Sequence, residues 1–308
     1  MIIASYNLDS LDDTDEDSRR FDTRAAVLRP KLVELRADIL CLQEIHSQKI
    51  GGERRLRALD SLLEGTPYAG YGRVHTVGDA GRSADVHNLV TLSRYPILNS
   101  GQVRHDLVPP LPWPQLADSE GSEPVTWDRP FLHAELDCGS ARRLHVLNLH
   151  LRAPIAAHVP AGRDHGQWRS TQLWAQGFAR ASLKRIGQAL EVRLFVERIF
   201  DNEAEALICV CGDFNAEGPE MPMRLIRASP EDVENAALER RQLIPLDPSG
   251  PSTIHAGRRM RPDHVLASQA LAARHRRSAL MNKDLPDDTM SDPADSPHAP
   301  ISAEFELD

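Results

Sequence analysis

The sequence contains few cysteines, no long apolar run and no excess of positive charge, and each absence argues against a class of protein. No apolar run approaches the length of a bilayer-spanning helix, so we expect no membrane span. Residues 1–7 run directly into a strand-like pattern, without the basic region and small-residue cleavage site of a signal peptide. Provided that no leader has been removed, we expect a cytoplasmic protein.

The four cysteines lack the spacing of a zinc or redox motif. Cys41, Cys138, Cys209 and Cys211 all lie in apolar, strand-like segments, and the last two are alternate residues of one strand. We therefore interpret all four as small core residues of a protein in a reducing compartment.

The charge and composition are those of an ordinary soluble globular protein. A net charge of -9 and a pI near 5.8 argue against a broad basic surface for duplex DNA, but they leave room for a local basic cleft. No composition shift, repeat or low-complexity tract divides the 308 residues, so we expect a single domain spanning residues 1–308.

Apolar periodicity predicts a chain of mixed strands and helices. Strands are predicted over residues 2–8, 38–44, 90–97, 130–136, 144–151, 206–211, 264–267 and 299–307. Helices are predicted over residues 19–36, 53–63, 171–200 and 221–228, and solvated or irregular loops over residues 9–17, 109–127, 153–169 and 284–295. The strands at 130–136 and 144–151 are expected to pair antiparallel through a turn at Gly139-Ser140.

The most informative segment is the apolar run 206–211 and the Gly212-Asp213-Phe214-Asn215 that follows it. A carboxylate and a carboxamide at a rigid strand end can orient a water, bind a hard cation or donate to a phosphate oxygen. Asp and Asn are also common turn residues whose side chains satisfy loop backbone, and taken alone the motif favours such a turn.

Other polar residues stand where predicted strands end or begin. Asn7 closes the first strand and Glu44 the second, whereas His150 lies in a polar alternation opposite leucines. Such residues are commonly helix caps or a solvated strand face, and the alternation alone favours a surface position for His150. Asp263 begins a strand and His298 precedes another, and the carboxylate would orient the imidazole if the two meet.

Taken together and in order, these motifs resemble the endonuclease/exonuclease/phosphatase superfamily, which includes pancreatic-type deoxyribonucleases, abasic-site endonucleases and neutral sphingomyelinases. The matching segments are Asn7, Leu42-Gln43-Glu44, Leu92-Ser93-Arg94-Tyr95-Pro96-Ile97, Asn148-Leu149-His150-Leu151, Gly212-Asp213-Phe214-Asn215, Arg261-Pro262-Asp263-His264 and His298-Ala299-Pro300-Ile301. The resemblance covers essentially the whole chain. It implies an α/β (α+β) four-layer sandwich, in which two mixed β-sheets pack face to face with helices on the outside.

The resemblance also implies a metal-dependent phosphoesterase that uses Mg²⁺, or Mn²⁺ in its place. By this likeness Glu44 is the principal metal ligand and Asn7 assists it. The metal would polarise the phosphoryl oxygen and neutralise the leaving group. The remaining site residues implied by the resemblance are His150, Asp213, Asn215, Asp263 and His298 as catalytic residues, and Asn148 and Arg152 as substrate contacts.

The roles within this set follow from the same resemblance. Asp213 and Asn215 match positions that orient the attacking water and hold the phosphate, and His150 matches a histidine that contacts phosphate or protonates the leaving oxygen. His298 matches the histidine that pairs with an aspartate, here Asp263. The residues leave open whether the base is Asp213 or the Asp263–His298 pair, since either can take a proton at neutral pH if its pKa is suitably shifted.

One departure from the family pattern concerns the metal. The family usually closes with Ser-Asp-His, whereas Pro297 precedes His298 in this sequence, so a frequent second metal ligand is missing. Asp295 or Asp292 could reach the same space by another loop path. A single metal held more weakly by Glu44 and Asn7 is the simpler expectation.

The substrate is left open by the sequence. By the resemblance the loops at 73–86, 109–127 and 152–170 surround the site, and the last could form a positive, aromatic-edged wall or an ordinary loop whose Trp168 caps the core. We expect a phosphodiesterase or nuclease-like enzyme whose substrate is a nucleic acid, a nucleotide or a small or lipid phosphoester, with no obligate protein partner. The alternatives are an intracellular phosphatase of a small or lipid phosphomonoester, and a non-catalytic binding module with the same fold.

Overall fold

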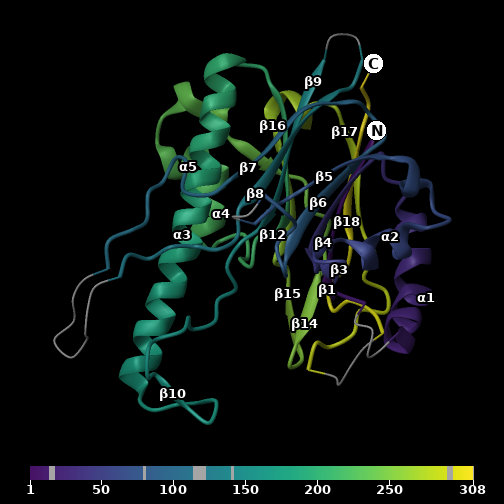
Figure 1. Cartoon of the computed structure of the whole chain (residues 1–308). Helices are drawn as coiled ribbons and strands as arrows, with labels where there is room; N and C mark the ends of the chain where they lie inside the picture. Colours follow the sequence, from purple (N-terminus) through teal and green to yellow (C-terminus); the bar gives the residue numbers. More distant parts are fainter. Residues whose placement is uncertain (14–17, 79–80, 114–122, 140–141, 290–293, 308) are drawn as a thin grey trace.

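Two six-stranded mixed sheets lie face to face, and helices cover the outer side of each (Figure 1). The structure is a computed structural model that describes residues 1–13, 18–78, 81–113, 123–139, 142–289 and 294–307. Parts of the predicted loops at 9–17, 109–127 and 284–295, including Asp292, and Ser140 of the predicted turn lie outside these residues. Among the described residues, no helix combines the length and apolar character needed to cross a membrane.

Each sheet has a single parallel pair at its centre. The first sheet has the order β17 (His275–Leu280), β18 (Ile301–Phe305), β1 (Ile2–Leu11), β2 (Ile39–Ile45), β6 (Asn88–Ser93) and β5 (Gly72–His75). The second has the order β13 (Leu243–Pro245), β16 (Asp263–Ser268), β12 (Leu207–Asp213), β9 (Arg143–His150), β8 (Phe131–Asp137) and β7 (Ile97–Val103). Only β1 with β2 and β9 with β12 pair in parallel, and the other neighbours are antiparallel.

This strand order decides which chain segments meet. Parallel strands end at the same edge of a sheet, so the carboxyl ends of β1 and β2 lie together, as do those of β9 and β12. The antiparallel neighbours β18, β6, β16 and β8 run the other way and therefore begin at that edge. Four strand ends and four strand beginnings thus gather around one opening.

Apolar side chains fill three layers between these elements. Helices α1 (Ser18–Leu35) and α2 (Arg57–Leu63) bury leucines against the first sheet, and α3 (Thr171–Asn202) and α4 (Met221–Arg227) cover the second. The middle layer lies between the sheets, and Cys41, Cys209 and Cys211 are buried there as free thiols. Strands covered on both faces are continuous apolar runs, which explains why the segment before Gly212 lacks alternation.

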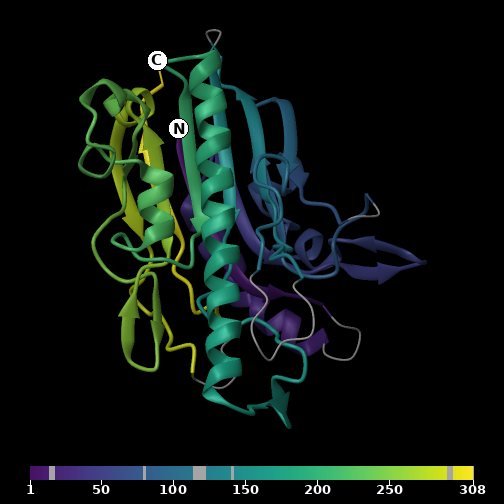
Figure 2. The same cartoon turned by 90° about the vertical axis from the view of Figure 1, so that its left-hand side faces the viewer.

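Helix α3 is the longest element and extends past the sheets. Its first turn is capped by the Ser170 hydroxyl, which accepts from the Leu173 backbone N–H at 3.2 Å. The amino-terminal half of α3 projects beyond the sheet edge toward the hairpin of β10 (Arg163–Asp164) and β11 (Gln167–Trp168) (Figures 1 and 2). This projecting half borders the opening described above.

Several predicted elements differ from the structure. The predicted helix 53–63 begins only at Arg57, because Glu53–Arg55 forms β4 and turns back onto β3 (Gln48–Ile50) through Gly51-Gly52. The predicted strand 90–97 is two strands, since β6 ends at Ser93 and β7 begins at Ile97 in the other sheet. The elements that periodicity did not reveal are β5, β10, β11, β13, β14 (Thr253–His255), β15 (Arg258–Met260), β17, α5 (Pro230–Val233), α6 (Gln269–Ala272) and the 3₁₀ turns Pro67–Gly70 and Ala236–Arg241.

Candidate active site

Asn7 links the two sheets at the centre of the opening. Its side-chain amide donates to Glu44 Oε1 at 3.1 Å and to Asp213 Oδ2 at 3.0 Å. Glu44 lies at the end of β2 and Asp213 at the end of β12, so this one amide bridges the two parallel pairs. The first strand continues past Asn7 to Leu11, which places Asn7 inside a strand rather than at its end as predicted.

A bulge orients the Glu44 carboxylate. The registers of β1 with β2 and of β2 with β6 both shift around Glu44, whose φ of 60° is left-handed. The backbone N–H and the hydroxyl of Ser10 each donate to Glu44 Oε2 at 3.1 Å. Burial raises the pKa of Glu44, but adjacent His87 and the charge of His150 outweigh it and lower the pKa, so this carboxylate is ionised at neutral pH.

Asp213 and Asn215 form a tight turn at the end of β12. Asn215 donates to the Asp213 carboxylate from its backbone N–H at 2.8 Å and from its side chain at 3.2 Å. Gly212 is required before it, because a Cβ there would lie 2.1 Å from the Leu149 carbonyl oxygen, at a φ of 139°. Burial raises the pKa of Asp213 to about 6, although the positive charge of His298 opposes the shift.

Asp263 and His298 meet across the two sheets. His298 Nδ1 lies 2.9 Å from Asp263 Oδ2, and the Ser252 hydroxyl donates to the same oxygen at 2.6 Å. Burial lowers the pKa of His298, but the charge and hydrogen bond of Asp263 outweigh it and raise the pKa to about 10. His298 is therefore an imidazolium at neutral pH.

His150 is buried, so the surface position that its alternation favoured is wrong. Its side chain is 2% exposed, and Nε2 lies 3.5 Å from Glu44 Oε1 and 3.6 Å from Asp213 Oδ2. The Arg129 guanidinium donates to the same nitrogen at 2.6 Å. Burial and the charge of Arg129 hold the pKa of His150 well below its usual value, so this imidazole is neutral.

Two groups of three side chains in this opening have the donor atoms of a metal site. They are Glu44, His87 and His150, and Asp213, Asp263 and His298, with the donor atoms of each group within 4.8 Å of one another. Glu44 is ionised, and His87 Nδ1, which faces it, is buried without a hydrogen-bond partner among the described residues, so these two side chains fit a divalent cation. His150 faces Glu44 with Nε2, to which Arg129 already donates.

The comparisons with known proteins agree with this geometry. A model of the Endonuclease/Exonuclease/phosphatase family matches residues 4–284. The chain belongs to this family. Members of the endonuclease/exonuclease/phosphatase family hydrolyse phosphoester bonds and generally use divalent metals. We found no significant match among curated proteins.

Solved structures show that this chain has the family fold. A Bacteroides thetaiotaomicron mannosyl-6-phosphatase is 16% identical with a TM-score of 0.57, over 100% of both chains. A Neisseria meningitidis 3'-5' exonuclease is 17% identical with a TM-score of 0.55, also over 100% of both chains. A humanised D. rerio TDP2 is 15% identical with a TM-score of 0.58, over 100% of this chain and 99% of the other. At these identities the likeness concerns the fold alone.

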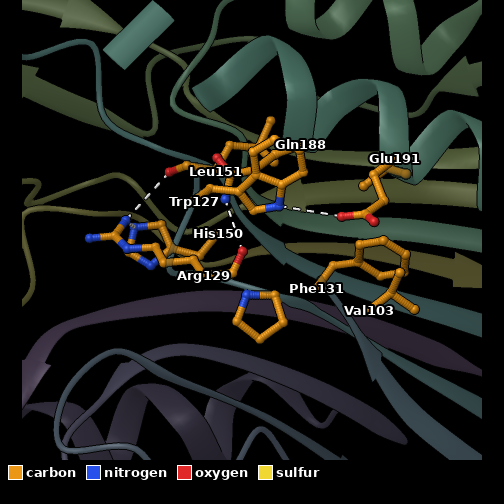
Figure 3. Close-up of a pocket in the computed structure, with 10 residues that line it drawn as sticks. Val103, Trp127, Arg129, Phe131, His150, Leu151, Gln188 and Glu191 are labelled. Atoms are coloured by element: carbon orange, nitrogen blue, oxygen red, sulfur yellow. Dashed lines mark hydrogen bonds between the residues drawn. The ribbon is translucent and has the colours of Figure 1, made fainter. Parts of the chain in front are cut away.

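Arg129 is a site residue that the resemblance to the family did not supply. It precedes β8, and the side chain of Gln188 on α3 donates to its carbonyl oxygen at 3.0 Å while accepting from the Arg152 backbone N–H at 2.8 Å. Figure 3 shows Arg129 and His150 at one end of a small pocket and Glu191 at the other. Its signal in the sequence is a charged residue directly before a predicted strand, the same signal that marked His298.

Glu191 supports the segment that carries Arg129. This carboxylate is 1% exposed and accepts from Trp127 Nε1 at 3.3 Å, and from the backbone N–H groups of His105 at 3.1 Å and Leu107 at 3.0 Å. Gly187, one turn before it, leaves room for the Trp127 ring, since a Cβ would lie 2.5 Å from that ring. Helix α3 therefore holds the Trp127–Arg129 segment against the site.

Asn148, which the resemblance implied as a substrate contact, lies between the two sheets. It is fully buried, and its amide donates to the carbonyls of Leu42 at 3.2 Å and Val90 at 3.0 Å. Its oxygen accepts from Gln43 Nε2 at 2.7 Å. All of these bonds cross from one sheet to the other, so Asn148 holds the sheets together beneath the site.

Of the two acids expected to reach the space of the acid missing before His298, the structure describes only Asp295. Asp295 is engaged elsewhere, because it pairs with Lys31 and accepts from the Tyr6 hydroxyl at 3.2 Å. Asp9, predicted to be part of a solvated loop, instead belongs to β1. Burial and the charge of Glu44 raise the pKa of Asp9, whereas the charges of Arg24 and His298 lower it. The Asp9 carboxylate is therefore close enough to Glu44 and His298 to be affected by their charges.

Proposed function

We propose that this chain is a metal-dependent phosphodiesterase of the nuclease kind, acting on nucleic acid. The observation that carries the proposal is the division of charge in one opening. Glu44 is an ionised carboxylate, Asp213 is a carboxylate with a pKa of about 6, and His298 is an imidazolium. A cation ligand, a base and a fixed positive charge are the groups that phosphoester hydrolysis requires.

Glu44, with Asn7 and Asp9 beside it, would hold the divalent cation. When bound, the cation polarises the phosphoryl oxygen and neutralises charge on the leaving oxygen. Asn7 also donates to Asp213, which sets the distance between the base and the Glu44 carboxylate.

The pKa values favour Asp213 as the base, a choice that the sequence left open. His298 keeps its proton up to a pKa of about 10, so the Asp263–His298 pair cannot accept one at neutral pH. Asp213, with a pKa of about 6, is ionised there and can take the proton of the attacking water as its oxygen bonds to phosphorus and the leaving oxygen departs. His298 and Arg129 would donate hydrogen bonds to the phosphate oxygens.

A basic segment leads away from this site. Residues 152–185 contain one acid, Asp164, and six basic side chains, in a chain whose net charge is -9. The six are Arg152, Arg163, Arg169, Arg180, Lys184 and Arg185. Burial lowers the pKa of Lys184, the charge of Asp128 raises it, and the like charges of Arg152 and Arg180 lower it further. Lys184 is therefore close enough to Arg152 and Arg180 to be affected by their charges. The positive charge suits a substrate with several phosphates.

Two stacked aromatic rings lie along the same helix. Trp174 is 45% and Phe178 39% exposed, and they are the only aromatic residues among the large exposed apolar side chains of the described chain. Their ring centroids are 5.5 Å apart with an interplanar angle of 28°. Arg185, two turns further on the same side of α3, donates to the carbonyl of Asn215, so this side of the helix borders the catalytic turn. Exposed rings beside basic residues are suited to stacking bases of a single strand.

A substrate panel tests the proposed function. We expect the purified protein to cleave bis(p-nitrophenyl) phosphate and a labelled single-stranded oligonucleotide, to lose activity with excess chelator and to regain it with added Mg²⁺ or Mn²⁺. Faster hydrolysis of p-nitrophenyl phosphate than of either diester would contradict the proposal and favour a phosphomonoester phosphatase. The absence of any hydrolysis by a protein that binds metal would instead indicate a binding module.

The double substitution Trp174→Ala and Phe178→Ala should weaken oligonucleotide cleavage selectively. Base stacking on an aromatic ring contributes about 1–3 kcal/mol, so we expect kcat/KM for a single-stranded 12-mer to fall by about 10-fold or more. The kcat/KM for bis(p-nitrophenyl) phosphate should stay within about 2-fold, because this ester is too small to contact Trp174 and Phe178 while it is bound at the catalytic turn. Leu194→Ala, an exposed apolar residue on the same helix, is the matched control. An equal loss on both substrates would contradict a stacking role.

A further inference from the structure

His87 lies against the Glu44 carboxylate, although nothing in the sequence motifs marks it. It directly precedes β6, and its φ of 57° is left-handed. His87 Nδ1 lies 3.6 Å from Glu44 Oε2, is buried, and has no hydrogen-bond partner among the described residues. A strained backbone thus holds a buried ring nitrogen against the expected metal ligand.

Neighbouring rings fix the orientation of His87. The His46 ring packs edge-to-face on it at 5.3 Å and 85°, and the His150 ring does the same at 5.9 Å and 77°. His46 in turn has Nδ1 3.7 Å from Asp12 Oδ2. These contacts leave the His87 ring little freedom to turn away from Glu44.

The distance between the two donor atoms is that of ligands sharing one ion. Nitrogen and carboxylate ligands lie about 2.1 Å from a transition-metal ion, and two such ligands at an angle of about 115° are about 3.5 Å apart. The observed separation is 3.6 Å. His150 is less suited to the same ion, because the Arg129 guanidinium already donates to its Nε2.

We propose that His87 and Glu44 together bind a first-row transition-metal ion, such as Mn²⁺, Co²⁺ or Zn²⁺, in preference to Mg²⁺. The inference rests on the proposed function in taking Glu44 as the metal ligand. Imidazole nitrogen suits transition metals, whereas Mg²⁺ takes oxygen donors almost exclusively. His87 adds a nitrogen donor to a site in which the usual second acid, before His298, is replaced by Pro297.

Metal titrations of the full chain test this assignment without reference to activity. We expect Co²⁺, followed by its visible absorption, to bind the apo protein at least about 10-fold more tightly than Mg²⁺, followed by calorimetry. His87→Ala should weaken Co²⁺ binding by about 10–100-fold and change Mg²⁺ binding by less than about 3-fold. His87→Asp should restore an oxygen donor and tighten Mg²⁺ binding relative to His87→Ala. Bound Mn²⁺ should show nitrogen hyperfine coupling in pulsed EPR, and His87→Ala should remove it.

The control and the contrary outcomes separate ligation from structural support. His255→Ala removes an exposed histidine whose Nδ1 lies 2.7 Å from Asp288 Oδ1, and it should leave both titrations unchanged. Unchanged Co²⁺ affinity in His87→Ala overturns the inference, and so does an equal loss of Co²⁺ and Mg²⁺ affinity, because that indicates a general disturbance of Glu44. If either result is obtained with an enzyme that is active, the proposed function stands and only the inference about His87 fails. If the protein binds Co²⁺ through His87 but hydrolyses no substrate, the inference stands and only the proposed function fails.

Discussion

Replacing Glu44 by Gln should lower kcat for phosphodiester cleavage by about 10³-fold or more. The substitution preserves the shape of the side chain but removes the negative charge that would hold the cation, and a bound cation contributes several kcal/mol to the transition state of such reactions. The oxygen that accepts from Asn7 can remain, so the bridge to Asp213 is retained. Initial rates with the labelled oligonucleotide at saturating metal would measure the loss.

A second carboxylate provides the control for Glu44→Gln. Glu135 on β8 pairs with Arg143 at 2.8 Å, and its side chain is 13% exposed against 16% for Glu44. Glu135→Gln should retain activity within about 2-fold, because Glu135 pairs with an Arg143 side chain that is 63% exposed, and such ion pairs contribute little. If Glu44→Gln keeps a thermal transition like that of the parent protein and still cleaves diesters at the parent rate, Glu44 is not the metal ligand of this reaction.

Replacing Asp263 by Asn should narrow the pH range of activity from its basic side. Activity in the parent protein should rise as Asp213 ionises near its pKa of about 6 and fall as His298 loses its proton near its pKa of about 10. Without the Asp263 charge and its hydrogen bond, burial is opposed only by the charges of Asp213 and Glu44, so the pKa of His298 should fall from about 10. We expect kcat at pH 8 to drop by about 10²–10³-fold, with the basic limb shifted down by several pH units.

A second aspartate–histidine pair, Asp247 with His264, provides the control for this experiment. The Asp247 carboxylate lies 2.6 Å from His264 Nδ1, and both side chains are buried. His264 packs edge-to-face on Phe214 and its Nε2 lies 2.8 Å from the Ala216 carbonyl, so the pair supports the Asp213 turn without including either group assigned to the pH limbs. Asp247→Asn should destabilise the fold but leave both limbs of the pH profile in place. A pH profile of Asp263→Asn that superimposes on the parent profile would show that His298 is not the group with the high pKa.

The Asp263–His298 pair also ties stability to pH. Since the pKa of His298 is higher in the folded chain than its ordinary value of 6.5, the pair's contribution is complete below about pH 6.5 and is lost as pH rises through about 10. The difference in unfolding free energy between the parent protein and His298→Ala, measured with urea, should therefore shrink over this range.

The sequence predicted the central strands β1, β2, β9 and β12, but it set the end of β1 too early, since this strand continues past Asn7 to Leu11. Asn7, Glu44, His150 and Asp213 follow or close apolar runs long enough to be strands buried on both faces, and a polar residue at the end of such a run stands out. Their order along the chain also identified the family, and with it the two-sheet fold. The long helix at 171–202 was visible for a related reason, since its apolar face repeats over many turns.

Other parts of the site could not be predicted from the sequence. Periodicity indicates which face of a strand a residue lies on, but not how far that residue is from the end of the strand at the site. Asn148 and His150 share one face of β9, yet only His150 reaches the opening, while Asn148 lies beneath it between the sheets. His87 and Arg129 belong to strands whose beginnings reach the site because β6 and β8 run antiparallel to central strands. A charged or polar residue before a strand is the local signal for them, and it is too common to distinguish these strand beginnings from others.

The sequence by itself thus determined the central strands, because local apolar patterning specifies which segments are buried. The order of its polar motifs identified the family, and that resemblance implied Asn7, Glu44 and Asp213 as site residues. The tertiary structure alone brought His87 and Arg129 into the opening, at the beginnings of antiparallel strands. It also placed Asp263 and His298, whose pairing the resemblance implied, within 2.9 Å of each other. The tertiary structure decided the charges of Asp213 and His298 as well, since their pKa values depend on burial and on partners far away in the chain.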